Sequence, residues 1–243
     1  MPRAPAPPST TSGAEPGRDH ILLISLDFQN VFGEIFGDFL VELFARGDVY
    51  WARTAATAMR LLVEEPRPDV VVVTDTGLTQ EHNLHVWDAV LAVIRQGGTG
   101  IIMGQFPANA RPSEARGFFL RAGLPWELGP RHRAVLVLNG EAESKIRHQD
   151  MLPNYFGYDA VCLKNVANRD AVYVECQDGG VEPVALEGSE AEWSRESPIV
   201  LTNLGEGRLG YIGDVDMRHE SVVLAIALGS FSACDWWKLS GSG

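Results

Sequence analysis

Three aspartates follow apolar runs of the sequence, at the points where buried strands are expected to end. Asp27 follows the run ILLISL, Asp75 comes after DVVVV and Thr74, and Asp214 follows RLGYIG. In an open parallel sheet, ligands bind outside the carboxyl ends of the strands. A carboxylate placed there can act as a general base or as a hydrogen-bond anchor. We therefore predict a small polar-ligand pocket in which these three aspartates are the catalytic candidates.

Other side chains are expected around the same pocket, because they follow the same runs or precede a later strand. The residues that we predict for substrate binding are Asn30, Thr76, Gln105, Phe106, Arg133 and Asp216. Asp and Asn also cap helices and turns in such loops on any fold. The alternative is therefore a cluster whose role is structural.

Two stretches could hold a metal ion. In the stretch DVDMRHE, the candidate ligands are Asp214, Asp216, His219 and Glu220. The same acidic residues also suit a helix N-terminus, where the helix dipole favours negative charge. His82 and His85 stand at helical spacing, but zinc would need a third ligand that the sequence does not identify. We predict no metal and no other cofactor.

The segment WELGPRHR concentrates an aromatic ring, two arginines and a histidine before an expected strand. If it folds over the strand ends, Arg131, His132 or Arg133 could bind a carboxylate or a phosphate. The alternative is a solvated connection with Trp126 packed in the core. The glycine-rich phosphate motifs and the GxSxG motif of α/β-hydrolases are absent from the sequence.

Strands and helices alternate along the first half of the chain, which favours parallel strands joined by right-handed crossovers. Apolar runs and helical periodicity predict strands at 21–26, 49–52, 69–74, 100–104, 133–138, 160–166 and 171–175, and helices at 30–46, 54–64, 81–96, 113–122 and 219–229. Runs 199–204 and 208–213 flank a Gly-Glu-Gly turn, which indicates a late antiparallel hairpin. The pattern predicts a three-layer α/β sandwich with a mainly parallel sheet.

We expect one folded domain over residues 20–235. Residues 1–19 are rich in Pro, Ala and Ser and predict a disordered tail, and residues 236–243 a C-terminal tail. Residues 139–158 are polar and irregular, which indicates an insertion or a lid. The Trp236-Trp237 pair suggests a hydrophobic clasp or a dimer contact.

The composition and net charge of the chain limit the classes of binding partner that we expect. Hydrophobic residues make up 45% of the chain and the formal net charge is −12, so we expect a globular protein that binds neither nucleic acid nor a membrane. Three cysteines without metal spacing, and no secretory signal, predict reduced thiols and a cytoplasmic location.

Three stretches carry a resemblance to a known family. They are DVVVVTD followed by a helix and GGTGIIMG, then FFLRAGLPWELGPRHRAVLVLN, and then PIVLTNLGEGRLGYIGDVD. Over about residues 20–230 the chain resembles the class I glutamine amidotransferase-like superfamily, with ThuA-like members and a fungal branch most similar. The resemblance implies a flavodoxin-like α/β fold and, by analogy, a homodimer.

The departures from the family pattern concern its catalytic groups. A glutamine amidotransferase needs Gly-x-Cys-x-Gly at a strained strand-to-helix turn. Here the turn reads Gly104-Gln105-Phe106-Pro107, so Gln105 or Phe106 falls where the cysteine would be. The family's later His-x-Glu corresponds to Asp214-Val215-Asp216. The chain therefore lacks the catalytic Cys-His pair, and glutaminase chemistry is not expected.

Two hypotheses for the function follow. One is an enzyme acting on a small molecule, a hydrolase or lyase that uses carboxylates or a bound water in place of a thiolate. The other is a catalytically inactive pseudoenzyme that binds a metabolite or a protein partner. The first needs two titratable groups around one point, whereas in the second Phe106 could fill the place of the nucleophile.

Overall fold

A computed structural model describes residues 18–27, 36–143, 146, 149–175, 195–216 and 219–229. Asn30, nearly all of the predicted N-terminal tail, the Trp236-Trp237 pair and the predicted C-terminal tail lie outside these residues. Within the described ranges, no helix is long and apolar enough to cross a membrane.

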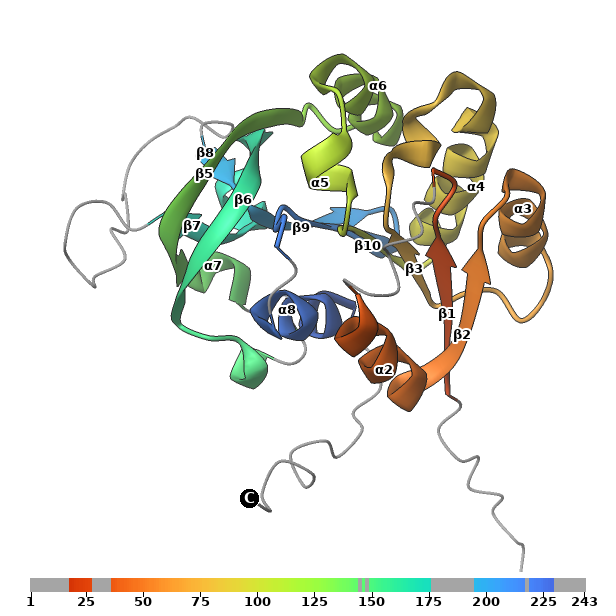
Figure 1. Cartoon of the computed structure of the whole chain (residues 1–243), viewed down its shortest axis with the longest axis horizontal. Helices are drawn as coiled ribbons and strands as arrows, with labels where there is room; N and C mark the ends of the chain where they lie inside the picture. The colour runs from red at the N-terminus through yellow and green to blue at the C-terminus, as the bar shows by residue number, and fades with distance from the viewer. Residues whose placement is uncertain are drawn as a thin grey trace, which may run out of the picture.

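One half of the ten-stranded sheet is parallel (Figure 1). Its strands are β1 (Asp19–Ile24), β2 (Gly47–Ala52), β3 (Val70–Val73), β4 (Thr99–Ile102) and β10 (Gly207–Ile212). They lie in the order β2-β1-β3-β4-β10, and each neighbouring pair is parallel. This is the flavodoxin-like order 2-1-3-4-5, with β10 in the fifth place.

The other half continues from β10 with antiparallel pairs only. Its strands are β9 (Ile199–Leu204), β7 (Ala171–Glu175), β5 (Glu127–Leu138), β6 (Tyr155–Val166) and β8 (Arg195–Ser197). The late hairpin β9–β10 is confirmed. The sequence placed the starts of β5 and β6 too late and missed β8. In β5 and β8 the ladder extends over polar residues, whereas the first residues of β6 had been assigned to the irregular segment 139–158.

Helices cover both faces of the sheet, which confirms the three-layer architecture (Figure 1). On one face lie α2 (Gly37–Arg46) and α8 (His219–Gly229), side by side. On the other lie α3 (Ala55–Val63), α4 (Leu84–Arg95), α5 (Phe106–Asn109) and α6 (Pro112–Ala122). Successive side chains of β1 therefore point to opposite faces of the sheet. Ile21 and Leu23 pack in the core beneath α2 and α8. Leu22 and Ile24 pack in the core beneath α3 and α4.

The described part of segment 139–158 connects β5 to β6. It contains α7 (Gly140–Glu143) and the 3-10 turn η3 (Gln149–Met151), and β6 begins inside it at Tyr155. Ile146 and Leu152 are buried in the core beneath α8. These residues therefore anchor the connection to the domain.

The hairpin turn between β9 and β10 packs backbone against backbone on the end of α4. Gly205 has φ +65°, and the Glu206 N–H donates to the Arg95 carbonyl at 3.0 Å. A Cβ on Gly207 would lie 2.1 Å from the carbonyl oxygens of Gly98 and Ile94. Only glycine fits this contact.

We expect Gly207→Ala to lower the free energy of unfolding by about 1–3 kcal/mol, because the turn must move off α4. Gly117→Ala on α6 is the matched control. A Cβ there meets no atom within 4 Å, so alanine should be neutral or stabilise the helix by up to about 1 kcal/mol. Urea denaturation of both variants is the measurement. Equal stability of the two would contradict the packing described.

Candidate functional site

The strand order reverses at β1, which lies between β2 and β3. In folds of this order, the crevice for ligands opens at the carboxyl ends of the two strands at the switch point. The residues that follow β1 and β3 include Asp27, Asp75 and Thr76. The sheet thus brings together three of the residues predicted for the site.

Asp75 joins the loops that follow β1 and β3. Its carboxylate accepts backbone N–H groups from Leu26 at 3.2 Å, Asp27 at 2.9 Å and Gly77 at 2.9 Å. Asp75 also begins the 3-10 turn η1 (Thr76–Thr79) as its N-cap. Burial raises the pKa of this carboxyl, the backbone hydrogen bonds oppose that shift, and the charge of Asp27 adds to it. Three backbone donors therefore take up most of the acceptor capacity of Asp75, and its carboxylate ties the two loops together.

Asp27 is the exposed carboxylate of this pair of loops. It accepts a hydrogen bond from the Thr76 hydroxyl at 3.0 Å, and Thr76 itself is nearly buried. This hydrogen bond holds the Asp27 side chain against the β3 loop. A carboxylate held in place and open to solvent can accept further hydrogen bonds from a ligand.

A buried chain of hydroxyl groups, which the sequence analysis missed, lies at the ends of β1 and β3. The Trp51 indole donates to the Ser25 hydroxyl at 2.9 Å, and the Ser25 and Thr74 hydroxyls are 2.5 Å apart. Because the Thr74 hydroxyl donates to the Ile24 carbonyl at 3.0 Å, Ser25 must donate to Thr74. The signal in the sequence was a hydroxyl residue at the end of each apolar run.

In the turn after β4 the left-handed backbone conformation falls on Gly104, one residue before the two positions that correspond to the missing cysteine in the sequence comparison. Gly104 has φ +73°, and the Gln105 N–H that follows donates to the Thr74 carbonyl at 2.8 Å. A Cβ on Gly104 would lie 2.8 Å from the Thr74 carbonyl oxygen and 3.3 Å from the ring of Phe36. This turn therefore has neither a reactive side chain nor room for one.

Phe106 and Gln105 lie on different sides of the same turn. The Phe106 ring is fully buried against Phe118 and Phe119, with ring centroids 5.3 and 6.1 Å away. Trp126 belongs to the same aromatic cluster, so its core alternative is correct. Gln105 is partly exposed at the strand ends. Of the two residues predicted there, only Gln105 reaches the surface.

Asp214 follows β10, which lies two strand spacings, or roughly 10 Å, from β3 in the sheet. Its carboxylate is fully buried and accepts hydrogen bonds from the Ser221 hydroxyl on α8 and from the Asp216 N–H at 3.0 Å. The Tyr158 hydroxyl is buried near Asp214 and makes no well-formed hydrogen bond to a described residue. Burial raises the pKa of Tyr158, and the charge of Asp214 adds to this shift. Asp214 thus fastens β10 to α8.

Arg133 lies in the antiparallel half, on β5, away from Asp27. Arg131 and Arg133 both bind the buried carboxylate of Asp159, with nitrogen–oxygen distances of 2.9 Å, and Arg131 also approaches Asp216 at 3.9 Å. Hydrogen bonds from the two guanidinium groups lower the pKa of Asp159 to about 2. His132 pairs with Glu175 on the neighbouring strand. These side chains therefore form ion pairs between β5 and its two neighbouring strands, β6 and β7.

The described residues contain no group of three His, Cys, Asp or Glu side chains placed to hold a metal ion. The His219 side chain lies outside them. His82 and His85 are both exposed, at the start of α4. Cys162 is buried, and burial raises the pKa of its thiol to about 12, so it is no nucleophile at neutral pH. Cys176 and Cys234 lie outside the described residues.

No protein-family model matches the chain, and no curated protein matches it in sequence. Solved structures do match its fold. A ThuA-like protein of Bacteroides uniformis has a TM-score of 0.56 at 12% identity, over 88% of this chain and 91% of that one. A ThuA-like protein of Parabacteroides merdae has a TM-score of 0.52 at 14% identity, over 90% and 92%. A β-galactosidase of Rahnella sp. R3 has a TM-score of 0.51 at 14% identity, over 88% of this chain and 31% of that one.

The chain therefore has the class I glutamine amidotransferase-like fold. It takes the form of this fold that is seen in ThuA-like proteins, over nearly the full length of both chains. At these identities the likeness is one of fold. The similar β-galactosidase contains the fold as about a third of a longer chain.

We expect Asp75→Asn to destabilise the protein by about 1–3 kcal/mol, because an amide NH₂ would face one of the backbone N–H groups that the carboxylate now accepts. Asp27→Asn is the control: it is exposed and its amide oxygen can still accept from Thr76, so the change should stay within about 0.5 kcal/mol. Chemical denaturation measures both. A larger effect at position 27 would refute the structural role of Asp75.

The Asp159 ion pairs should make stability depend on pH. Because the pKa of Asp159 is lowered from 3.8 to about 2, its contribution is complete above 3.8 and is lost as the pH falls towards 2. Urea midpoints of the wild type and Asp159→Asn should therefore differ above pH 3.8 and converge near pH 2. A difference that does not change with pH would show that Asp159 stabilises the fold without its charge.

Proposed function

We propose that this chain is a catalytically inactive relative of the amidotransferase-like enzymes that binds a small, hydroxyl-rich or amine-bearing molecule at the ends of β1 and β3. One observation carries the proposal. At the turn where such an enzyme holds its nucleophile, this chain has Gly104 with the Phe36 ring packed near it. Acyl transfer through a covalent intermediate has no attacking group there.

The other candidate catalytic carboxylates support the same proposal. Asp75 accepts three backbone N–H groups, and Asp214 is sealed beneath α8 by Ser221. A general base must reach the proton that it removes, and neither group presents a free oxygen to solvent in the described structure. Asp27 is the carboxylate that a ligand can meet.

The chemistry of the exposed groups defines the ligand. Asp27 accepts hydrogen bonds, and Gln105, which follows β4 two strands along the sheet, can accept or donate. Hydroxyl and ammonium groups donate to such a carboxylate, whereas a phosphate or carboxylate ligand would be repelled by it. A neutral polyol, a sugar or an amino sugar fits this edge better than an anion.

A hydrolase is the second candidate, and one observation favours it. The pKa of Asp75 is raised by burial and by its neighbour Asp27, which is the arrangement of a carboxylic acid beside a carboxylate. The β-galactosidase likeness is compatible with a hydrolase, but it supports the fold alone. The homodimer, the cytoplasmic location and the domain limits 20–235 stay predictions.

Thermal-shift and calorimetric titrations with neutral sugars, amino sugars, sugar phosphates and organic acids test the proposal. A ligand at about 100 times its Kd adds roughly 2.7 kcal/mol to stability. We expect a shift with a neutral or cationic compound that Asp27→Asn removes and that Asp48→Asn, an exposed aspartate at the other end of the sheet, leaves unchanged.

Turnover separates the two candidates. Incubation of the ligand with the wild type, followed by NMR, should show no product. A product whose formation Asp27→Asn or Asp75→Asn abolishes would instead establish the hydrolase. Binding of anions as tight as that of neutral ligands would contradict the ligand class.

A further inference from the structure

An apolar ridge lies exposed on α2. Val41 and Phe44 are 67% and 56% exposed, and their spacing of three positions makes them neighbours on the helix surface. Leu40, beside them, is only partly buried against the core. Phe39 and Leu43 hold the other side of the helix in that core. We call Leu40, Val41 and Phe44 the α2 ridge.

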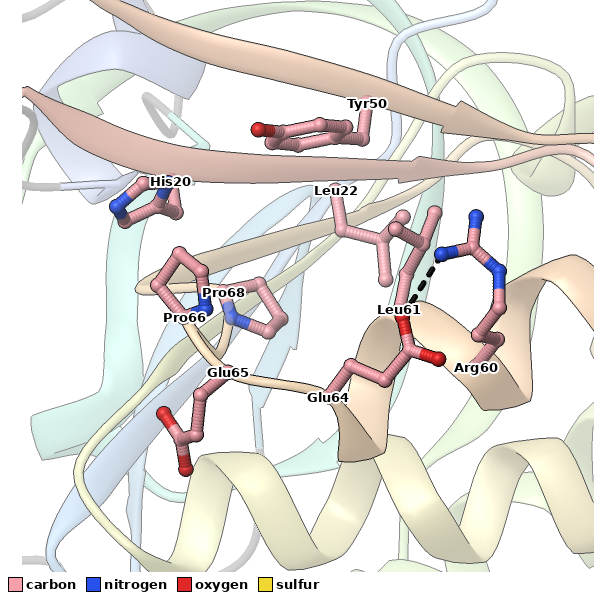
Figure 2. A pocket seen from close by; sticks show the side chains of 9 residues that line it. All are labelled: His20, Leu22, Tyr50, Arg60, Leu61, Glu64, Glu65, Pro66 and Pro68. Atoms are coloured by element: carbon pink, nitrogen blue, oxygen red, sulfur yellow. Dashed lines mark hydrogen bonds and ion pairs between the residues drawn. The ribbon is translucent and has the colours of Figure 1, made fainter.

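The α2 ridge is the open apolar surface of the layer that α2 and α8 form. The sequence of α8 is apolar around the whole helix, and of its residues 221–229 only Val223 is partly exposed. Tyr50, which is also exposed, belongs to another surface. It lies on the opposite face of the sheet, where its ring lines a cavity together with Leu22 and Leu61 (Figure 2).

The chain leaves α8 on the same layer as the ridge. The two helices lie side by side (Figure 1). α2 is followed at once by Gly47, the first residue of β2, so it ends at the amino ends of the parallel strands. α8 begins beyond Asp214 at the carboxyl end of β10, and a Cβ on Gly210, in the middle of that strand, would lie 3.6 Å from a Leu228 methyl. Both helices therefore run towards the end of the layer that carries Phe44.

The sequence that follows α8 is short and rich in large apolar side chains. Residues 230–237 read SFSACDWW and lie outside the described residues. Eight extended residues reach about 25 Å. α2, with ten residues, is about 15 Å long. Trp236 and Trp237 can therefore reach any part of the neighbouring ridge.

The charges beside the ridge and beside the tryptophans are opposite. Asp38 stands three positions before Val41 on α2 and is exposed, whereas Glu42 is already paired with Arg46. Lys238, one of three lysines in a chain of net charge −12, directly follows the tryptophans. An ammonium group is thus available for Asp38 when the two apolar surfaces meet.

We propose that residues 230–237 fold back within the same molecule over the α2 ridge, so that the Trp236-Trp237 pair covers Val41 and Phe44. Each tryptophan can bury about 150–250 Å². A short tether gives the pair an effective concentration in the millimolar range, which favours the segment of the same chain over a free partner. This contact lies on α2 and does not depend on the ligand edge at Asp27.

Fluorine NMR of the full chain, labelled with 5-fluorotryptophan, tests the contact. The chain has six tryptophans, and Trp236→Phe and Trp237→Phe assign the two resonances of interest. We expect both resonances to lie away from the position of free 5-fluorotryptophan. They should not move when the protein is diluted about ten-fold, because the contact is made within one molecule.

Two matched double variants locate the contact. Val41→Ser combined with Phe44→Ser should move both resonances towards the free position, because the ridge loses its apolar surface. Val63→Ser combined with Leu120→Ser is the control. These two side chains are 61% and 54% exposed on α3 and α6, which cover the other face of the sheet, so the resonances should stay in place.

Three results would overturn the proposal. The first is a pair of resonances at the free position in the wild type. The second is an equal shift in both double variants. The third is a pair of resonances that returns to the free position on dilution while sedimentation shows a dimer dissociating, because the tryptophans would then cover the ridge of a second copy.

Discussion

The carboxylate of Asp75 holds together the part of the molecule on which any activity at the strand ends depends. Backbone N–H groups at the ends of two neighbouring strands have no ladder partner, and one buried side chain accepts three of them. The close approach that results leaves no room for a side chain at Gly77, where a Cβ would lie 2.5 Å from Leu26. The hydrogen bond from Thr76 then holds the Asp27 carboxylate against this pair of joined loops.

Two other buried carboxylates of the molecule also join separate elements through hydrogen-bond donors. Asp214 connects a strand to a helix, and Asp159 connects two arginines on the neighbouring strand. In each case a buried negative charge is balanced by hydrogen-bond donors, as burial requires. An acidic chain of this composition therefore uses part of its charge for internal connections, and the density of carboxylates in the sequence overstates the number available for chemistry.

The sequence predicted the parallel half well, because each of its strands is buried on both faces and forms an apolar run. It placed Asp27, Asp75 and Asp214 at one edge of the sheet correctly. It could not show that Asp75 and Asp214 are occupied, since this depends on donors such as Ser221 that lie far away or in another element. Nor could it show which glycine of the turn after β4 has the positive φ, because this depends on the contact of Gly104 with the Thr74 carbonyl. The sequence did not show the full length of β5, because the first residues of this strand are polar and one of its faces is exposed.

The central position of β10 has a consequence for how the chain is made. This strand pairs with β4, more than a hundred residues earlier, and it is the link between the parallel and antiparallel halves. As the chain leaves the ribosome, β4 presents an open edge until the last part of the domain has emerged. Such an edge can pair with other chains. A chain stopped short of residue 207 would keep that edge exposed, so the cell has reason to protect or remove incomplete copies of this protein.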